Sequence, residues 1–361
     1  MNHPYSGFHQ VPLKKPGHSV AQEILPWLFQ QNLTGALPLL RNDEPHLLLE
    51  ELHRQLLTPF IYQQILCHDL QQSLSPAVLR GLAHDYALAL RETALQEQEA
   101  RRVIQALSQA GVEVILLKGA DLRLRAYEDP ATRPMTDIDL LIAPAQLQPG
   151  LAALARLGYR PAASHRDPRP GFREQFGHEI TLAPPPGTRL LVDLHWEIRA
   201  VACYYRLPFD FLQAVSIYWR EGEVPVKVLA PEHALIHLCL HTFGDSLGAF
   251  PEALPFLDLA LVLTRLPLDW PRFLREVARC RCQLPIYLIL REMSGLLPQA
   301  IPGGVLTHLQ EYRPDWRERL VLRLVLSLRF LGGKFPWLEE QRHFWEWATF
   351  YLAGGRGKAS C

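Results

Sequence analysis

The stretch Met135-Thr136-Asp137-Ile138-Asp139-Leu140-Leu141-Ile142 carries two carboxylates two residues apart, in a run that is otherwise typical of a buried strand. Side chains two apart on a strand point to the same face, so both acids converge while Ile138, Leu140 and Ile142 pack on a core. Two like charges in a half-buried sheet repel each other and cost desolvation, unless a cation lies between them. Because oxygen-only ligation suits hard ions, we expect Mg²⁺ or Mn²⁺ rather than zinc.

Two neighbouring apolar runs strengthen this interpretation, since roughly one Asp-x-Asp is expected by chance in a chain of this length. Upstream, the run 112–117 ends abruptly at Lys118-Gly119-Ala120, which predicts a strand entering a small-residue turn. Downstream, the run 190–196 predicts another short strand with Asp193 at its centre. Three predicted strands therefore bring three acids to one site.

These sequence segments resemble those of the uncharacterised nucleotidyltransferase family of bacteria, one branch of the DNA polymerase beta-like nucleotidyltransferase superfamily. The resemblance covers roughly residues 75 to 265. It implies an α+β fold, in which a small mixed β-sheet nucleotidyltransferase core is flanked by N-terminal helices and a C-terminal helical domain. The matching residues and segments are Leu117-Lys118-Gly119, Tyr127, Arg133, Asp137–Leu141, Val192-Asp193-Leu194-His195-Trp196, Leu235–His241 and Phe256–Ala260.

The resemblance also implies a phosphate turn and a metal site. In the superfamily, a glycine followed by a small residue opens a helix and cradles nucleotide phosphates, and paired acids on the next strand bind metal. By this resemblance Gly119 and Ala120 form the phosphate turn, while Asp137, Asp139 and Asp193 are the catalytic residues and the metal ligands. The usual serine is replaced by Ala120, and the interval to the acids is long. Backbone N–H groups at a helix N-terminus can still bind phosphate.

Four further residues are candidates for contacts with the nucleotide. Lys118 supplies a mobile cation, and the guanidinium of Arg133 can hold two phosphate oxygens at once. His195 can orient Asp193 or touch substrate, and His178 lies on a predicted neighbouring strand that faces the same cleft. Plainer interpretations stay open, namely a solvated strand-end lysine, two packing histidines, and acids that merely form a surface ion pair with the arginine.

The activity implied by the resemblance is Mg²⁺-dependent nucleotidyl transfer. The enzyme moves an NMP from an NTP, expected to be ATP, to a hydroxyl-bearing acceptor and releases pyrophosphate. We expect the acceptor to be a peptide natural product, a saccharide or another small molecule. Two alternatives stay open. In the first alternative, which the missing serine favours, the chain is a catalytically inactive nucleotide-binding or antitoxin-like module. In the second, it is a toxin that nucleotidylates tRNA or protein.

The composition is that of an ordinary soluble protein, with 48% hydrophobic and 20% charged residues among 361. The formal net charge is zero, so we expect no nucleic-acid partner. Six cysteines at irregular spacings are typical of reduced thiols, and the N-terminus lacks an apolar signal segment. Because no uncharged apolar run reaches about 18 residues, we expect a cytoplasmic protein without membrane contact.

Local signals predict how the chain is organised. Ser75-Pro76 is an N-cap and N1 pair that opens one long helix ending near Ala110. The segment 161–170, dense in Pro and Arg, predicts a mobile lid, and Pro184–Gly187 predicts a hairpin turn. The predicted regions are 1–74 (N-terminal helical region), 75–230 (nucleotidyltransferase-like catalytic domain) and 231–361 (C-terminal helical domain).

A histidine repeat lies at the start of the predicted C-terminal domain. His233, His237 and His241 recur every four residues and therefore share one helix face. Three ligands on a straight helix span roughly 12 Å, which is too far for one zinc ion with bonds of about 2.1 Å. We therefore expect core or acceptor-binding roles for them.

Overall fold

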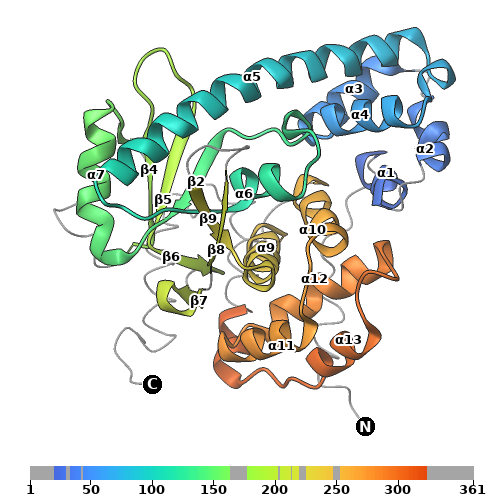
Figure 1. Cartoon of the computed structure of the whole chain (residues 1–361). Helices are drawn as coiled ribbons and strands as arrows, with labels where there is room; N and C mark the ends of the chain where they lie inside the picture. Colours follow the sequence, from blue (N-terminus) through green and yellow to red (C-terminus); the bar gives the residue numbers. More distant parts are fainter. Residues whose placement is uncertain are drawn as a thin grey trace.

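A mixed seven-stranded β-sheet lies at the centre of the fold. The computed structural model describes residues 20–29, 33–41, 44–162, 177–201, 204–212, 214–218, 225–246 and 253–322. Within these residues the strands follow the order β3-β4-β5-β2-β1-β9-β8. Helices surround the sheet, so the predicted α+β fold class is confirmed (Figure 1).

The strands are short, and two of the neighbouring pairs are parallel. β2 pairs with β5 and β1 pairs with β9 in parallel, while the other pairs of this sheet are antiparallel. A separate antiparallel pair consists of β6 (Glu197–Ala200) and β7 (Tyr205–Pro208). The strands of the large sheet are β1 (Ile115–Leu116), β2 (Asp137–Leu141), β3 (Arg160–Pro161), β4 (Glu179–Ala183), β5 (Leu191–His195), β8 (Ala214–Tyr218) and β9 (Pro225–Leu229).

The two faces of β2 and β5 differ in character, as their alternating sequences predict. Ile138 and Leu140 of β2 join Val192 and Leu194 of β5 in one buried apolar cluster. Helices α5 (Pro76–Gln109) and α7 (Leu147–Arg156) contribute to the same cluster, so they cover this face. The acids of both strands therefore lie on the opposite face.

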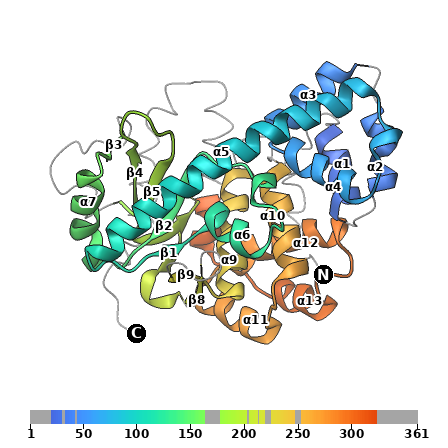
Figure 2. The same ribbon diagram turned by 45° about the horizontal axis from the view of Figure 1, so that its top comes forward.

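The long helix α5 begins and ends as its sequence predicts. The hydroxyl of Ser75 accepts a hydrogen bond from the backbone N–H of Val78, which caps the helix N-terminus. Gly111, just beyond the C-terminus, has φ +71°, a left-handed conformation that glycine adopts without steric cost. Figure 2 shows α5 running from the N-terminal helices across the sheet. The chain then enters β1 directly.

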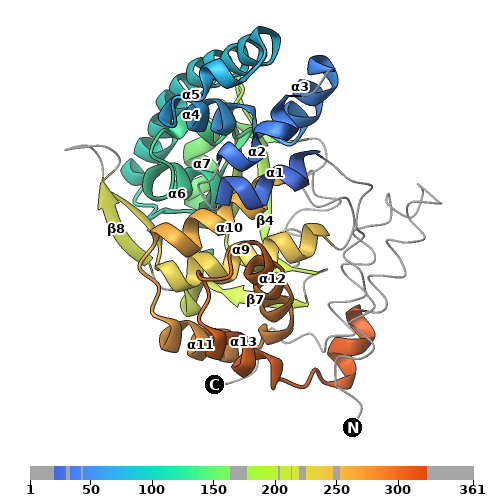
Figure 3. The ribbon, with the colours of Figure 1, turned by 90° about the vertical axis from the view of Figure 1, so that its right-hand side faces the viewer.

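The remaining helices form a second apolar cluster that includes both ends of the described chain. The N-terminal helices pack with α10 (Ala253–Arg265) and its neighbours in this cluster, and Figure 3 shows them above α9 and α10. The predicted three-part division of the chain stays a prediction. The other helices are α1 (Val20–Phe29), α2 (Leu33–Leu40), α3 (Pro45–Arg54), α4 (Thr58–Cys67), α6 (Lys118–Arg125), α9 (Pro231–Ser246), α11 (Trp270–Arg279), α12 (Gln283–Leu296) and α13 (Gly303–Gln310).

Several local predictions can be compared with the structure. The hairpin around Pro184–Gly187 is confirmed, because β4 and β5 pair antiparallel on either side of it. The run 112–117 is strand only at Ile115 and Leu116, and the helix begins at Lys118 rather than after a turn. The predicted lid lies almost entirely outside the described residues. Among the described helices, none is both long and apolar enough to span a bilayer.

A buried ion pair ties the segment before β2 to α10. The guanidinium of Arg133 donates to both carboxylate oxygens of Asp258, at 3.1 and 2.8 Å. The hydroxyl of Tyr127 donates to the same carboxylate at 2.7 Å. Asp258 is only 2% exposed, so this pair is shielded from solvent. It fixes the approach of the chain to the acid-bearing strand.

Replacing Asp258 by asparagine should lower the free energy of unfolding by about 3–5 kcal/mol, because the buried Arg133 guanidinium then lacks its counter-charge. A matched control is Glu128→Gln, which removes an exposed carboxylate paired with Arg265 and should cost no more than about 1 kcal/mol. Urea unfolding followed by circular dichroism measures both variants. Equal losses in the two would contradict the anchoring role of Asp258.

Candidate active site

Three aspartates meet on the polar face of the sheet. Asp139 of β2 and Asp193 of β5 are direct neighbours in the parallel pairing, and Asp137 lies two residues before Asp139 on the same face. Each of the three offers a carboxylate oxygen, and these oxygens all lie within 4.8 Å of one another. The structure thus brings together the three acids that the sequence predicts to converge.

Mutual repulsion and burial make this cluster of carboxylates electrostatically unfavourable. Burial and the charges of Asp139 and Asp193 raise the pKa of Asp137 to about 6. The pKa of Asp193 is also raised, mainly by burial. Oδ1 of Asp193 is buried and has no hydrogen-bond partner, which is costly for a carboxylate oxygen. A divalent metal ion, which prefers carboxylate oxygens, would relieve both costs, so the residues fit such an ion.

Lys118 supplies a positive charge inside the cluster. Its Nζ donates to Oδ1 of Asp139 at 2.8 Å, from the first residue of α6. Burial would lower the pKa of Lys118, but the carboxylate of Asp139 outweighs burial and the pKa is raised. The backbone has φ +44°, a left-handed conformation that costs a non-glycine residue about 1–3 kcal/mol. That the lysine binds a triphosphate stays a prediction.

Gly119 and Ala120 occupy the first turn of α6. Their backbone N–H groups belong to the unpaired donors of a helix N-terminus, and Leu117 provides no side-chain cap. A Cβ added at Gly119 would lie 3.1 Å from Nη1 of Arg133, which leaves little space for a side chain. The side chain of Ala120 is 2% exposed and packs in the apolar cluster. Only backbone donors of this turn can therefore face a phosphate.

His195 lies between two carboxylates. Its Nε2 is 3.0 Å from Oδ1 of Asp139, and its Nδ1 is 3.1 Å from Oε2 of Glu179. Burial would lower its pKa, but hydrogen bonds to Asp139 and Glu179 outweigh burial and raise it to about 9. His178 lies 3.7 Å from the same glutamate, and burial lowers its pKa to about 4. His195 thus contacts the acid cluster directly, whereas the contact of His178 is to Glu179, and its predicted role at the nucleotide stays a prediction.

Glu179 is a member of the site that the sequence interpretation misses. It faces His195 across the β4–β5 hairpin, where the two residues are paired in register. No local signal identifies this partner, because residues 184–190 separate β4 from β5 and the Pro-rich turn alone does not set which residues of the two strands are opposite each other. Without the pairing of β4 with β5, the sequence indicates only an exposed acid on a strand.

Arg133 lies between Gly119 and Asp258 and is largely buried. Besides the bidentate pair with Asp258, its Nη1 donates to the backbone carbonyl of Pro134 at 2.6 Å. Burial would lower its pKa, but Asp258 outweighs burial and raises it. The predicted triphosphate contact stays untested, and the position assigns Arg133 to the support of Gly119.

The histidine repeat of α9 divides into two groups. His233 points to Glu276 of α11, with Nε2 and Oε2 3.3 Å apart. The rings of His237 and His241 lie near each other, with centroids 6.5 Å apart. Burial lowers the pKa of both, and the charges of Lys118, Asp139 and His195 also act on each ring. The repeat therefore divides into His233, which contacts α11, and the neighbouring rings of His237 and His241.

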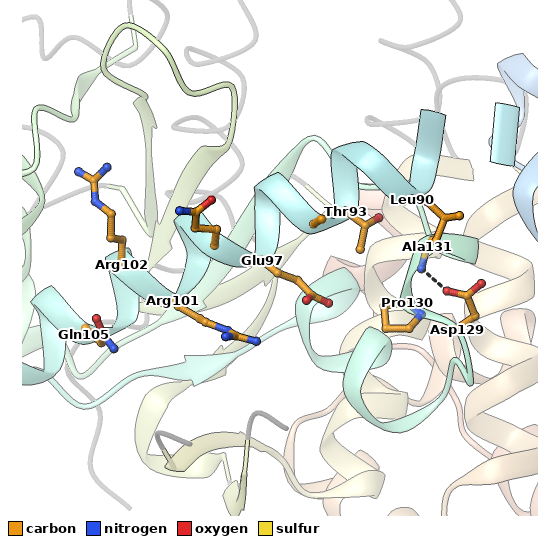
Figure 4. A pocket seen from close by; sticks show the side chains of 11 residues that line it. Leu90, Thr93, Glu97, Arg101, Arg102, Gln105, Asp129, Pro130 and Ala131 are labelled. Atoms are coloured by element: carbon orange, nitrogen blue, oxygen red, sulfur yellow. Dashed lines mark hydrogen bonds between the residues drawn. The ribbon is translucent and has the colours of Figure 1, made fainter. Parts of the chain in front are cut away.

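A hollow of about 600 Å³ lies along α5 and η2 (Pro130–Thr132), and none of the three aspartates lines it. Arg102, on its wall, pairs with Glu99 at 3.2 Å. Asp129 accepts a hydrogen bond from the hydroxyl of Tyr86. It also accepts one from the backbone N–H of Ala131 (Figure 4). Arg102 and Asp129 are thus paired within the protein. The acid cluster is the better candidate for chemistry.

Comparison with known proteins adds one finding. A family model described as an uncharacterised nucleotidyltransferase matches residues 41–298. No curated protein and no solved structure matches the chain. The matched span reaches from the start of α3 to the end of α12, so it contains every residue of the acid cluster.

Asp137→Asn should stabilise the metal-free protein at neutral pH, on the order of 1 kcal/mol, because it removes a carboxylate that ionises unfavourably in the folded state. The pKa of Asp137 is raised from 3.8 to about 6. Its ionisation therefore destabilises the folded state increasingly as the pH rises through this range, and fully at pH values above it. The gap between variant and wild type should close as the pH falls from about 6 to about 4.

Urea unfolding of both proteins in a chelator, at several pH values, measures this gap. The exposed Glu113→Gln is the control and should show no such pH dependence. A wild type that is more stable than Asp137→Asn at high pH would contradict the repulsion argument.

Proposed function

The chain belongs to the uncharacterised nucleotidyltransferase family, and on that premise we propose that it transfers an NMP from an NTP, expected to be ATP, to a hydroxyl-bearing acceptor. The observation that carries the proposal is the convergence of Asp137, Asp139 and Asp193, from two adjacent parallel strands, within 4.8 Å. The acceptor oxygen forms a bond to the α-phosphorus, and the bond from that phosphorus to the bridging oxygen breaks. Pyrophosphate leaves, and the hydroxyl proton is released.

In this proposal the three aspartates hold divalent ions, for which Mg²⁺ is the expected metal and Mn²⁺ the substitute. Such ions, when bound, offset the charge that develops on the entering and leaving oxygens. The protein supplies the placement. Asp193 has a buried oxygen without a hydrogen-bond partner, and Asp139 has one oxygen anchored by Lys118 and His195.

The start of α6 is the proposed triphosphate side of the site. Backbone N–H groups of Gly119 and Ala120 and the positive end of the helix dipole favour an anion there. The ammonium of Lys118 is adjacent and can exchange the carboxylate of Asp139 for phosphate oxygens once other cations neutralise the acids. We further propose that His237 and His241, on whose rings the charges of Lys118 and Asp139 act, contribute to binding of the acceptor.

Incubation with each of the four NTPs labelled at the α-phosphate, Mg²⁺ and a pool of hydroxyl-bearing metabolites tests the activity. We expect pyrophosphate release and a labelled product, both reduced about 10³-fold or more in the double variant Asp139→Asn, Asp193→Asn. The control Glu113→Gln, an exposed acid outside the cluster, should retain activity. Nucleotide binding without turnover across all acceptor pools would instead favour an inactive binding module.

Lys118→Met separates the two proposed roles of the lysine. Loss of a competing cation beside Asp139 should tighten Mn²⁺ binding to the nucleotide-free protein by about tenfold. Loss of the same cation beside the triphosphate should raise the KM for NTP by about tenfold. Calorimetric titration with Mn²⁺ and steady-state kinetics measure the two effects. Unchanged Mn²⁺ binding would show that the ion pair does not compete with metal.

A further inference from the structure

Glu179 is connected to the acid cluster through a single histidine. Oε2 of Glu179 lies 3.1 Å from Nδ1 of His195, and Nε2 of the same ring lies 3.0 Å from Oδ1 of Asp139. The imidazole is 7% exposed, whereas the glutamate side chain is 35% exposed. A buried ring therefore links a carboxylate at the rim to the most buried of the three aspartates.

The two contacts fix the protons on the ring. An ionised carboxylate accepts hydrogen bonds but cannot donate them, so each ring nitrogen must carry a hydrogen to bond its partner. The imidazole thus donates in both directions, and its orientation is held at both ends. Without an acceptor at Nδ1, the neutral ring could place its one hydrogen there and turn a lone pair toward Asp139.

We propose that Glu179 is a positioning residue, which acts through His195 to fix the carboxylate of Asp139 for its role in the site. The proposal rests on the proposed function. Rotation about the last torsion of an aspartate is soft, so a carboxylate needs outside partners to hold its orientation. His195 and Lys118 both bind Oδ1 of Asp139, which leaves Oδ2 as the oxygen that this side chain can turn toward an ion.

Direct metal ligation by Glu179 is the competing role, and the geometry does not support it. Within the described part of the chain, the acidic group whose oxygens can share one ion consists of the three aspartates. Glu179 lies on β4, one strand further from β2, and its Oε2 is directed at the histidine. In comparable sites, removing the partner that orients a ligand typically costs about 10–100-fold in metal affinity or activity.

Two substitutions at Glu179 test the proposal on the full chain. Glu179→Ala removes the acceptor for Nδ1, whereas Glu179→Gln keeps an acceptor oxygen at the same reach. We expect Mn²⁺ affinity, measured by calorimetric titration, to fall about tenfold or more in the alanine variant and to be largely restored in the glutamine variant. Glu113→Ala, which removes an exposed glutamate that pairs with Lys227, is the matched control and should bind Mn²⁺ as the wild type does.

A second readout needs neither metal nor turnover. Nitrogen NMR of the histidine ring should show the hydrogen bond at Nδ1 of His195 in the wild type and in Glu179→Gln, and its loss in Glu179→Ala. The proposal is overturned if Glu179→Ala changes neither the NMR signals of the His195 ring nor the Mn²⁺ affinity. It is also overturned if the glutamine and alanine variants lose Mn²⁺ affinity equally. If the wild type binds Mn²⁺ as expected but transfers no nucleotide, the proposed function fails while the positioning role stands.

Discussion

Repulsion among Asp137, Asp139 and Asp193 is the constraint on which the rest of the site depends. The parallel register of β2 and β5 forces two of these carboxylates to face each other, and burial makes their repulsion stronger than it would be in water. The protein offsets part of the cost with the ammonium of Lys118 and the ring of His195, both on one oxygen of Asp139. What remains uncompensated lies on the other two acids, and that imbalance makes the cluster suited to a cation.

Much of this arrangement follows from local sequence patterns. Alternation of acids with Ile138 and Leu140 predicts a strand with one polar and one apolar face, and the structure has this strand. The Pro-rich turn predicts the β4–β5 hairpin, and the cap at Ser75 predicts the start of α5. These signals work because each depends on the geometry of a few consecutive residues. They do not determine the full order of the strands, because strand pairing joins residues that are far apart in the chain.

Contacts between distant parts of the chain could not be predicted in this way. An arginine such as Arg133 is a typical phosphate-binding residue. Its actual partner, Asp258, is 125 residues away, on a helix whose sequence pattern indicates only a buried apolar face. Glu179 has no local signature, because its role depends on the ring across the hairpin. Lys118 was expected in a turn, yet it begins a helix with φ +44°. In each case the decisive partner, or the strain, arises from tertiary packing.

The link from Arg133 and Tyr127 to Asp258 has a consequence for how this protein can be divided. The guanidinium that backs Gly119 is neutralised by a helix that follows the last strand of the sheet, so the sheet does not carry its own counter-charge. A fragment that ends after β9 would lack Asp258, so the guanidinium of Arg133 would lose its counter-charge. The half of the protein that contains the sheet is therefore not expected to fold without α10, which carries Asp258.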